Sequence, residues 1–150
     1  MATSTEAIET VLTPGGTNYV PVKQGSGIYN MNITGDLLLA GISAADIVTA
    51  FTPGHKFKIL GVFAISIVAP TTAAKLATVT PYIGATAVTG GVLSLTTAAL
   101  ATKGTVLAGS AVTAANVGSE TDTISLTGSA VTAFVEGSAC IMIRIQNLEG

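Results

Sequence analysis

The stretch Ile141-Met142-Ile143-Arg144-Ile145-Gln146, near the end of the chain, alternates isoleucine with longer or more polar side chains. Successive side chains of a β-strand point to opposite faces of the sheet, so this period of two predicts a strand. Isoleucine is also stiff about χ1 and packs well on a pleated surface. We therefore expect the three isoleucines to lie in the core and the other three side chains to face away from it.

Other segments have the same period. In Tyr29–Ile33 the apolar residues alternate with asparagine, and Thr123–Thr127 alternates hydroxyl with aliphatic side chains. The longer segment Phe57–Val68 is apolar on both sides, and strict alternation divides it into two faces. One predicted face holds Phe57, Ile59, Phe63, Ile65 and Ile67, and the other holds Lys58, Leu60, Val62, Ala64 and Ser66.

The segments between these strands carry short turn signals. Gly90-Gly91 separates residues 86–89 from residues 92–95, which predicts a tight hairpin, and Pro53-Gly54 and Lys103-Gly104 predict further turns. A helical pattern of 10–15 residues does not alternate with the strands, which argues against a parallel α/β sheet. The sequence therefore predicts an all-β fold: an antiparallel β-sandwich or barrel of the jelly-roll type, with an extended N-terminal arm.

The first 35 residues differ in character from the remainder. They contain Thr13-Pro-Gly-Gly-Thr17 and Gln24-Gly-Ser-Gly27, with short apolar pieces between them. One interpretation is a frayed terminus, and the other is an extended arm that orders against a neighbouring subunit. Tyr19, Val20 and Val22 are more apolar than a pure linker requires and are candidate capsid or subunit contacts. We expect an arm over residues 1–35 and a single β domain over residues 36–150.

The composition restricts the classes of function. Hydrophobic residues make up 49% of the chain and charged residues 9%, against about 25% charged residues in ordinary globular chains. The net charge of −2 shows no excess of the positive charge that binds a nucleic acid or an anionic membrane, so neither is expected as a partner. A surface with so few charges is poorly protected against association. We expect a homo-oligomer, most simply a trimer, although a monomer with a Thr/Ser surface is the alternative.

The high mean hydropathy of +0.67 raises the question of a membrane. The longest apolar stretch, Ile59 to Pro70, has about 12 residues, fewer than the roughly 20 that a spanning helix needs. The N-terminus lacks the basic start and apolar core of a signal peptide. We therefore expect a protein that is synthesised in a cytoplasm.

Residues that could support chemistry are few. His55 beside Lys56 and Lys58 could hold a small anion, but a turn before a strand is the simpler interpretation. Cys140, the single cysteine, lies beside Ile141 in the alternating strand, which favours a buried small apolar group over a nucleophile.

A possible calcium loop with Asn116, Glu120 and Asp122 lacks the spacing of known calcium motifs, which favours a solvated loop. Phosphate-binding, nucleophile-elbow and Cys/His metal motifs do not occur. The sequence thus predicts no catalytic site, no cofactor, no metal and no enzymatic activity.

Five segments, taken in order, carry a resemblance to a known family: residues 70–80, 88–96, 118–126, 131–137 and 141–147. They resemble small head-associated proteins of tailed bacteriophages. The resemblance spans about residues 50–150 and lies in the residue types of these segments and in their order along the chain. The arm has no counterpart in that family. It implies a capsid decoration (cement) protein: a compact, often trimeric β domain that binds the major capsid protein on the outer surface of the virion and reinforces the lattice. Arg144 is a further candidate contact, because the only arginine could pair with an acidic residue across a subunit boundary.

Two other functions fit an all-β chain of this composition. A receptor- or glycan-binding module of a virion surface would show exposed aromatic residues around a pocket, and Tyr19, Tyr29 and Tyr82 are the only tyrosines. A tail-tube-type subunit would assemble alone into rings.

Overall fold

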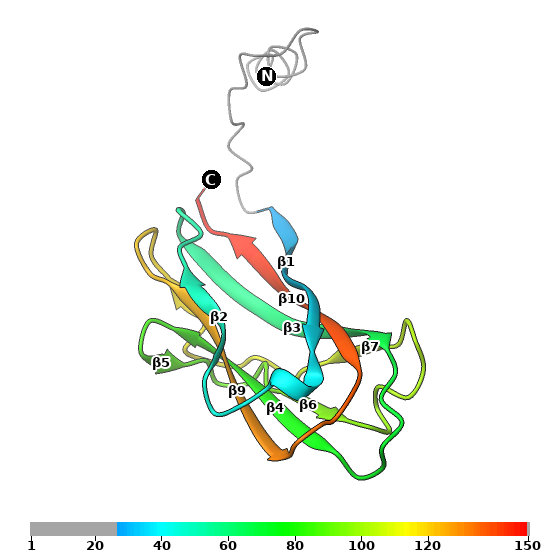
Figure 1. The fold of residues 1–150 in the computed structure, drawn as a ribbon. Coiled ribbons are helices and arrows are strands. Elements are labelled where there is room, and N and C mark those ends of the chain that lie inside the picture. Colours follow the sequence, from blue (N-terminus) through cyan, green and yellow to red (C-terminus); the bar gives the residue numbers. More distant parts are fainter. Residues whose placement is uncertain (1–26, 150) are drawn as a thin grey trace, which may run out of the picture.

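Two antiparallel sheets pack against each other in the computed structural model, which describes residues 27–149 apart from the side chains of Thr49, Ala130 and Val131 (Figure 1). The first sheet has the order β1-β10-β3-β7, and a short β8 also pairs with β3. Its strands are β1 (Ile28–Leu38), β10 (Ser138–Asn147), β3 (Phe57–Val68), β7 (Val106–Ala108) and β8 (Val117–Gly118).

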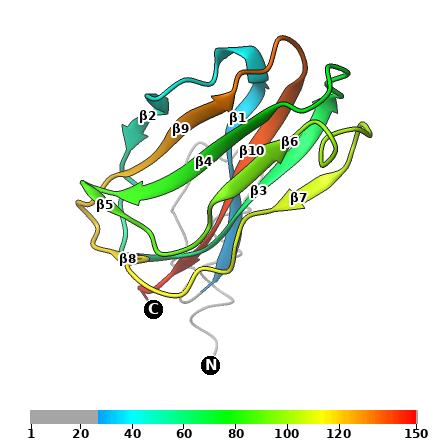
Figure 2. The same ribbon diagram turned by 90° about the horizontal axis from the view of Figure 1, so that it is seen from below.

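The second sheet has the order β2-β9-β4-β5, and β6 also pairs with β4. Its strands are β2 (Asp46–Phe51), β9 (Ile124–Thr132), β4 (Leu76–Ile83), β5 (Thr86–Ala87) and β6 (Leu93–Thr96). A single 3₁₀ turn, η1 (Leu39–Gly41), follows β1. Seen from below, β9, β4 and β6 lie in front of β1, β10 and β3 (Figure 2).

The eight longest strands follow the jelly-roll arrangement. Four of them form the row β1-β10-β3-β7, the other four are β2, β9, β4 and β6, and β1 to β4 alternate between the sheets along the chain. Of the two architectures that the sequence leaves open, the sandwich is the one observed, and the all-β prediction is confirmed.

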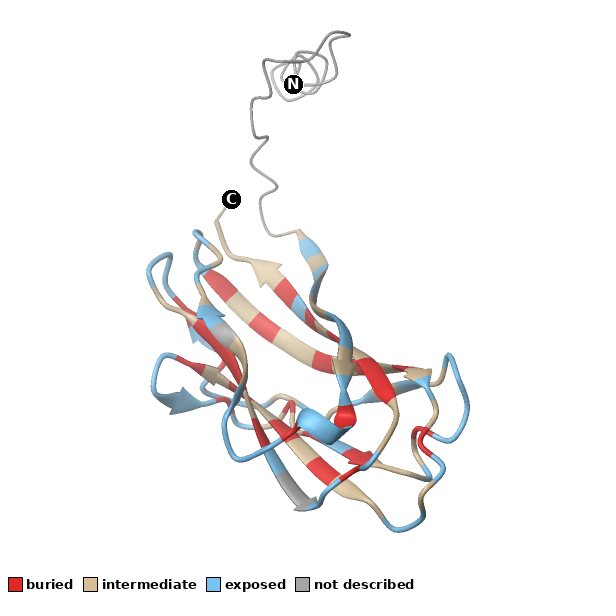
Figure 3. Ribbon diagram, viewed as in Figure 1, coloured by how far each residue is buried: buried red, intermediate tan, exposed pale blue. Residues whose placement is uncertain are grey.

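Strand β10 lies at the centre of the first sheet, between β1 and β3, and its alternation is as the sequence predicts. The side chains of Ile141, Ile143 and Ile145 have no exposed surface, and Arg144 is exposed. From the opposite sheet, Val79, Leu93, Leu95, Ile124 and Leu126 are equally buried against them. Buried and less buried residues alternate along β3 and β10 (Figure 3), so one face of each strand forms the core.

The predicted faces of β3 are wrong beyond Ile59. Phe57 and Ile59 lie on one face as expected, and both are buried, but the next buried side chains are Val62, Ala64 and Ser66. The register explains the change: Ile145 of β10 lies opposite Ile59, while Arg144 lies opposite Gly61. The strand therefore has one extra residue at this point, a β-bulge, which moves every later side chain to the other face.

The hairpin predicted at Gly90-Gly91 is also wrong. β5 and β6, on either side of it, both pair with β4 and not with each other. The two glycines instead lie against the segment that follows β7, where the Gly91 N–H donates to the Ser110 carbonyl. A Cβ on Gly90, whose φ is +94°, would overlap the carbonyl of Ala111, so this close approach requires glycine.

The N-terminal boundary differs from the expected one. β1 begins at Ile28, so residues 28–35 of the predicted arm lie in the first sheet. Tyr29, Met31 and Ile33 pack against the core. Tyr19, Val20 and Val22 lie outside the described residues.

Glu136 joins two loops at one end of the sandwich. One of its carboxylate oxygens, Oε1, accepts hydrogen bonds from the Thr72 N–H at 2.6 Å, the Thr71 N–H at 2.9 Å and the Thr71 hydroxyl at 3.1 Å. Hydrogen bonds from Thr72, and then from Thr71, favour the ionised form and lower the pKa of Glu136 from 4.5 to about 2. The charged carboxylate thus holds the turn before β10 to the loop between β3 and β4.

Replacing Glu136 by glutamine is expected to remove an acid-sensitive part of the stability. Because the pKa is lower in the folded protein, the carboxylate stabilises the fold above pH 4.5 and loses this effect as the pH falls through about 2. Urea unfolding of wild type and Glu136→Gln should differ most at neutral pH, and the difference should shrink in acid. Glu120→Gln is the control, since the Glu120 carboxylate accepts no hydrogen bond from any of residues 27–149. A difference that is constant with pH would contradict the role of the charge.

Candidate functional site

The outward surface of the first sheet is apolar over β3, β7 and the first half of β10. Across the strands, Met142 lies opposite Phe63, Cys140 opposite Ile65, and Ile65 opposite Val106. Val106 is 60% exposed and Ala108 is also exposed, and the other aliphatic and aromatic side chains of this surface are half-buried. We call this surface the apolar face; its residues are Phe63, Ile65, Ile67, Val106, Ala108, Cys140 and Met142.

The outward surface of the second sheet carries many hydroxyl side chains, with Leu76 and Tyr82 at the two ends of β4. Thr78 lies opposite both Ser129 and Ser94, and Thr80 lies opposite Thr127. Their chain neighbours point into the core, so the hydroxyls face solvent. We call this surface the hydroxyl face; its residues are Thr78, Thr80, Ser94, Thr96, Thr127 and Ser129.

The bulge in β3 explains why the sequence does not reveal the apolar face. Strict alternation placed Phe63, Ile65 and Ile67 on the same face as Phe57. The extra residue at Leu60–Gly61 turns them outward instead. The signal for this was Gly61, because an isolated glycine inside a strand often marks a bulge.

Arg144 is the one charged residue at the centre of this outward surface. Its guanidinium carbon lies 5.1 Å from the centroid of the Phe63 ring, a cation–π distance, and its Nε donates to Asn30 Oδ1 at 3.2 Å. Gly61, opposite Arg144, leaves room for the ring, since a Cβ there would lie 3.1 Å from Phe63 Cε2. The sequence prediction that Arg144 faces outward is therefore correct. Phe63 and Asn30 contact its guanidinium group, and Gly61 leaves the space that the Phe63 ring occupies.

Replacing Arg144 by alanine is expected to cost only about 0.5–1 kcal/mol of unfolding free energy, the usual contribution of an exposed cation–π pair. The side chain is exposed and its loss opens no cavity. Arg144→Lys should retain part of this energy, because the ammonium can still lie over the ring. Urea unfolding measures both values, and a loss above about 2 kcal/mol for Arg144→Ala would contradict this description of the site.

Cys140 also lies on the apolar face, and it is half-buried there, not buried as the sequence predicted. Ala139 and Ile141, its neighbours, point into the core, and the alternation of β10 directs Cys140 outward. The side chain is half-buried, and its Sγ lies 3.3 Å from Asn32 Oδ1, to which it donates. An amide oxygen is not a base that would activate a thiol, so this geometry gives no sign of a nucleophile.

His55 sits in the turn before β3, as the simpler interpretation of the sequence expects. Because the Lys56 carbonyl can only accept, His55 Nδ1 donates to it at 3.0 Å, and Nε2 accepts from the Tyr29 hydroxyl at 2.6 Å. Burial raises the pKa of Tyr29, which therefore keeps its proton at neutral pH. Both ring nitrogens are engaged, so the arrangement does not support an anion site at His55.

The residues of the possible calcium loop point in different directions. Asn116 is buried, and its amide donates to the Ile59 carbonyl at 2.8 Å. Asp122 accepts from the Ser119 N–H at 2.7 Å and from the Ser119 hydroxyl at 3.0 Å, which closes a local turn. Among residues 27–149, His, Cys, Asp and Glu side chains form no group of three that could hold a metal ion.

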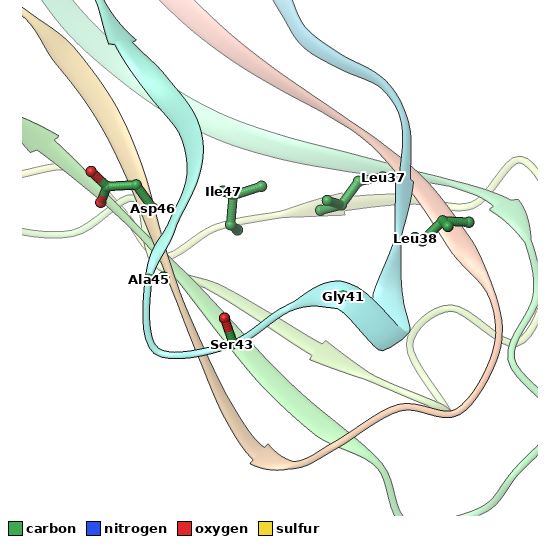
Figure 4. A pocket seen from close by; sticks show the side chains of 7 residues that line it. All are labelled: Leu37, Leu38, Gly41, Ser43, Ala45, Asp46 and Ile47. Atoms are coloured by element: carbon green, nitrogen blue, oxygen red, sulfur yellow. The ribbon is translucent and has the colours of Figure 1, made fainter.

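A shallow pocket of about 210 Å³ lies between the end of β1 and the start of β2 (Figure 4). Leu37 and Ile47 point toward each other across it, while the Asp46 side chain points away and accepts from the Thr127 hydroxyl at 2.7 Å. Ligand pockets of about 300–1,000 Å³ with converging polar groups are usual. This pocket is smaller and has no aromatic lining, so its geometry does not support a receptor glycan or a metabolite there.

No protein-family model matches the chain, and no curated protein matches it either. In the described part of the chain, no helix is long and apolar enough to cross a membrane. The contrast between the apolar and hydroxyl faces is therefore the strongest functional observation.

Proposed function

We propose that this chain is a structural virion protein of a tailed bacteriophage, which binds the major capsid protein on the outer surface of the capsid and reinforces the lattice. The observation that carries the proposal is the apolar face on one sheet, with the hydroxyl face on the other. In a decoration protein, the apolar face would dock and the hydroxyl face would remain in water. The sequence resemblance to phage head proteins supplies the identity of the partner.

The chemistry of the apolar face supports docking. Contiguous exposed apolar surface on a folded protein usually marks an interaction site, and charged residues are depleted at the centres of interfaces. Arginine and aromatic residues are frequent among the residues that contribute most to binding, which fits Arg144 lying over Phe63. We propose a purely structural role, which the half-buried apolar face supports.

We further propose that the protein is a small closed homo-oligomer, most simply a trimer. The low charge of the surface supports association, and many copies on a lattice would make weak individual contacts durable. Light scattering of the isolated protein should then give three times the chain mass of 14.8 kDa. The mass of a single chain at tens of micromolar would overturn this part of the proposal.

Co-sedimentation of the full-length chain with empty capsids tests the proposed function. The capsids should come from the phage that carries the gene, and negative-stain images should show the protein alone and with the shells. We expect the chain to pellet with the capsids at a fixed ratio and to add density to their outer surface. Rings or tubes formed without capsids would favour the tail-tube alternative, and a chain that stays in the supernatant would overturn the proposal.

A further inference from the structure

Within residues 27–149, the guanidinium group of Arg144 uses only one of its nitrogens for a hydrogen bond. Nε donates to Asn30 Oδ1 at 3.2 Å, and this is the one hydrogen bond that the group makes there. The four N–H groups on Nη1 and Nη2 have no acceptor among these residues. The Phe63 ring lies 5.1 Å from the guanidinium carbon. The side chain is thus held by Asn30 and Phe63, and its two Nη groups remain as a fork at its end.

The charge around this fork is positive. Strands β3, β7, β8 and β10 carry two charged residues, Lys58 and Arg144, and both are cations. The two chain neighbours of Lys58 are buried, so Lys58 also faces outward. The acidic residue of β1, Asp36, lies six positions beyond Asn30, which is opposite Arg144. At about 3.3 Å per residue this is roughly 20 Å along the strand, too far for Asp36 to neutralise Arg144.

Docking of the apolar face would remove water from this cation. Arg144 contacts Phe63 and lies two positions from Met142 on the same side of β10, so a partner that covers these residues also covers the guanidinium group. A buried charge without a counter-charge is costly, and buried N–H groups without acceptors add to the cost. A backbone carbonyl would accept a hydrogen bond but leave the charge. A carboxylate neutralises the charge and accepts from both Nη groups in parallel.

We propose that the surface bound by the apolar face presents an aspartate or glutamate carboxylate, which binds both Nη groups of Arg144 end-on. The carboxylate belongs to the major capsid protein, so this inference rests on the proposed function. The positive charges of Arg144 and Lys58 favour an acidic partner surface over a neutral or basic one. Because Asn30 and Phe63 already hold the guanidinium group, its binding costs less side-chain entropy than that of a mobile arginine.

A second copy of the chain is a less favourable source of the carboxylate. Six acidic residues lie in the described part of the chain, and most of them already accept hydrogen bonds from their own chain. These are Asp46, Asp122, Glu136 and Glu149. Binding to Arg144 of a neighbour would break those hydrogen bonds, which leaves Asp36 and Glu120 as the described acids that could take part without such a loss.

Co-sedimentation of full-length variants with empty capsids measures the contribution of the pair. Arg144→Gln should bind by about tenfold or more weakly than wild type, because docking would then bury the carboxylate without its cation. Arg144→Lys should fall between these two, since an ammonium keeps the charge but not the fork. Lys58→Gln is the matched control: it removes the same charge from the outward side of the same sheet and should bind within about threefold of wild type.

Carbodiimide cross-linking of Arg144→Lys on the capsid identifies the carboxylate. The reagent joins a carboxylate to an amine in contact with it, and this substitution places an amine where wild type has the guanidinium group. At a saturating concentration of the variant, peptide mass spectrometry should locate an amide bond between position 144 and an aspartate or glutamate of the major capsid protein. Thr80→Lys places an amine on the hydroxyl face and should form no link to the capsid.

The outcomes separate this inference from the proposed function. If wild type does not pellet with capsids, the proposed function fails and the inference fails with it. If wild type binds and Arg144→Gln binds equally well, or Lys58→Gln is weakened as much as Arg144→Gln, the inference alone is wrong. A link from position 144 to a second copy, seen as a dimer on a denaturing gel, would overturn the assignment to the capsid protein. Capsid-bound Arg144→Lys without a link from position 144 to the capsid protein would also overturn it.

Discussion

Replacing Ile143 by alanine is expected to lower the free energy of unfolding by about 2–5 kcal/mol, the usual cost of truncating a buried isoleucine. Its side chain has no exposed surface and lies in β10, the central strand that pairs with both β1 and β3. Met31 and Val62 lie opposite it on the two sides, so the cavity would have core walls that cannot easily collapse. Urea unfolding followed by circular dichroism measures the loss.

Arg144→Ala is the matched control for this prediction, because it lies one position further along the same strand with its side chain outward. Its loss should stay near 1 kcal/mol. A harmless Ile143→Ala together with an unfolded Arg144→Ala would mean that β10 is displaced by one residue, since such a shift exchanges the two faces of a strand.

Replacing Met142 by aspartate is expected to weaken capsid binding by at least tenfold, which corresponds to about 1.4 kcal/mol. Met142 faces outward on the apolar face, between Asn32 of β1 and Phe63 of β3. In the free protein the new carboxylate would remain partly hydrated, but docking would remove water from it without providing a partner. Co-sedimentation with empty capsids over a range of protein concentrations measures the change.

Thr80→Asp places the same charge on the hydroxyl face and is the control. Thr80 has an outward position in β4 comparable to that of Met142 in β10. Thr80→Asp should bind capsids like wild type, and both variants should retain cooperative unfolding. Equal weakening by both substitutions would indicate a general charge effect, and full binding by Met142→Asp would show that the apolar face does not dock.

The sequence predicted the elements whose side chains follow a simple period. In β10 an uninterrupted alternation sets the buried face, and that prediction is confirmed. In β3 the same argument fails after Ile59, because the bulge is defined by which residues of β10 lie opposite. Pairing between strands distant in sequence is a tertiary property, so local periodicity could only hint at it through Gly61. The hairpin at Gly90-Gly91 failed for the same reason, since β4 takes up both flanking strands.

The candidate site was predictable in part. Alternation in β10 correctly placed Arg144 outward, and it would also have placed Cys140 outward had it been extended two residues back from Met142. The contact between Arg144 and Phe63 depends on the bulge and could not be read from the sequence. The contrast between the two outer faces needed the complete sheet order, because each face combines residues from strands far apart in the chain.

The alkylation rate of Cys140 tests the central claim most directly, because this single thiol lies on the apolar face itself. Its rate of reaction with a maleimide, read from the peptide mass spectrum, should be measured for the chain free in solution and bound to empty capsids. Ser94→Cys in a Cys140→Ser background provides the matched thiol on the hydroxyl face. If the apolar face docks, the capsid should slow the reaction of Cys140 at least tenfold and leave Ser94→Cys unchanged. If Cys140 reacts equally fast in the bound and free states, the apolar face is not the surface that meets the capsid.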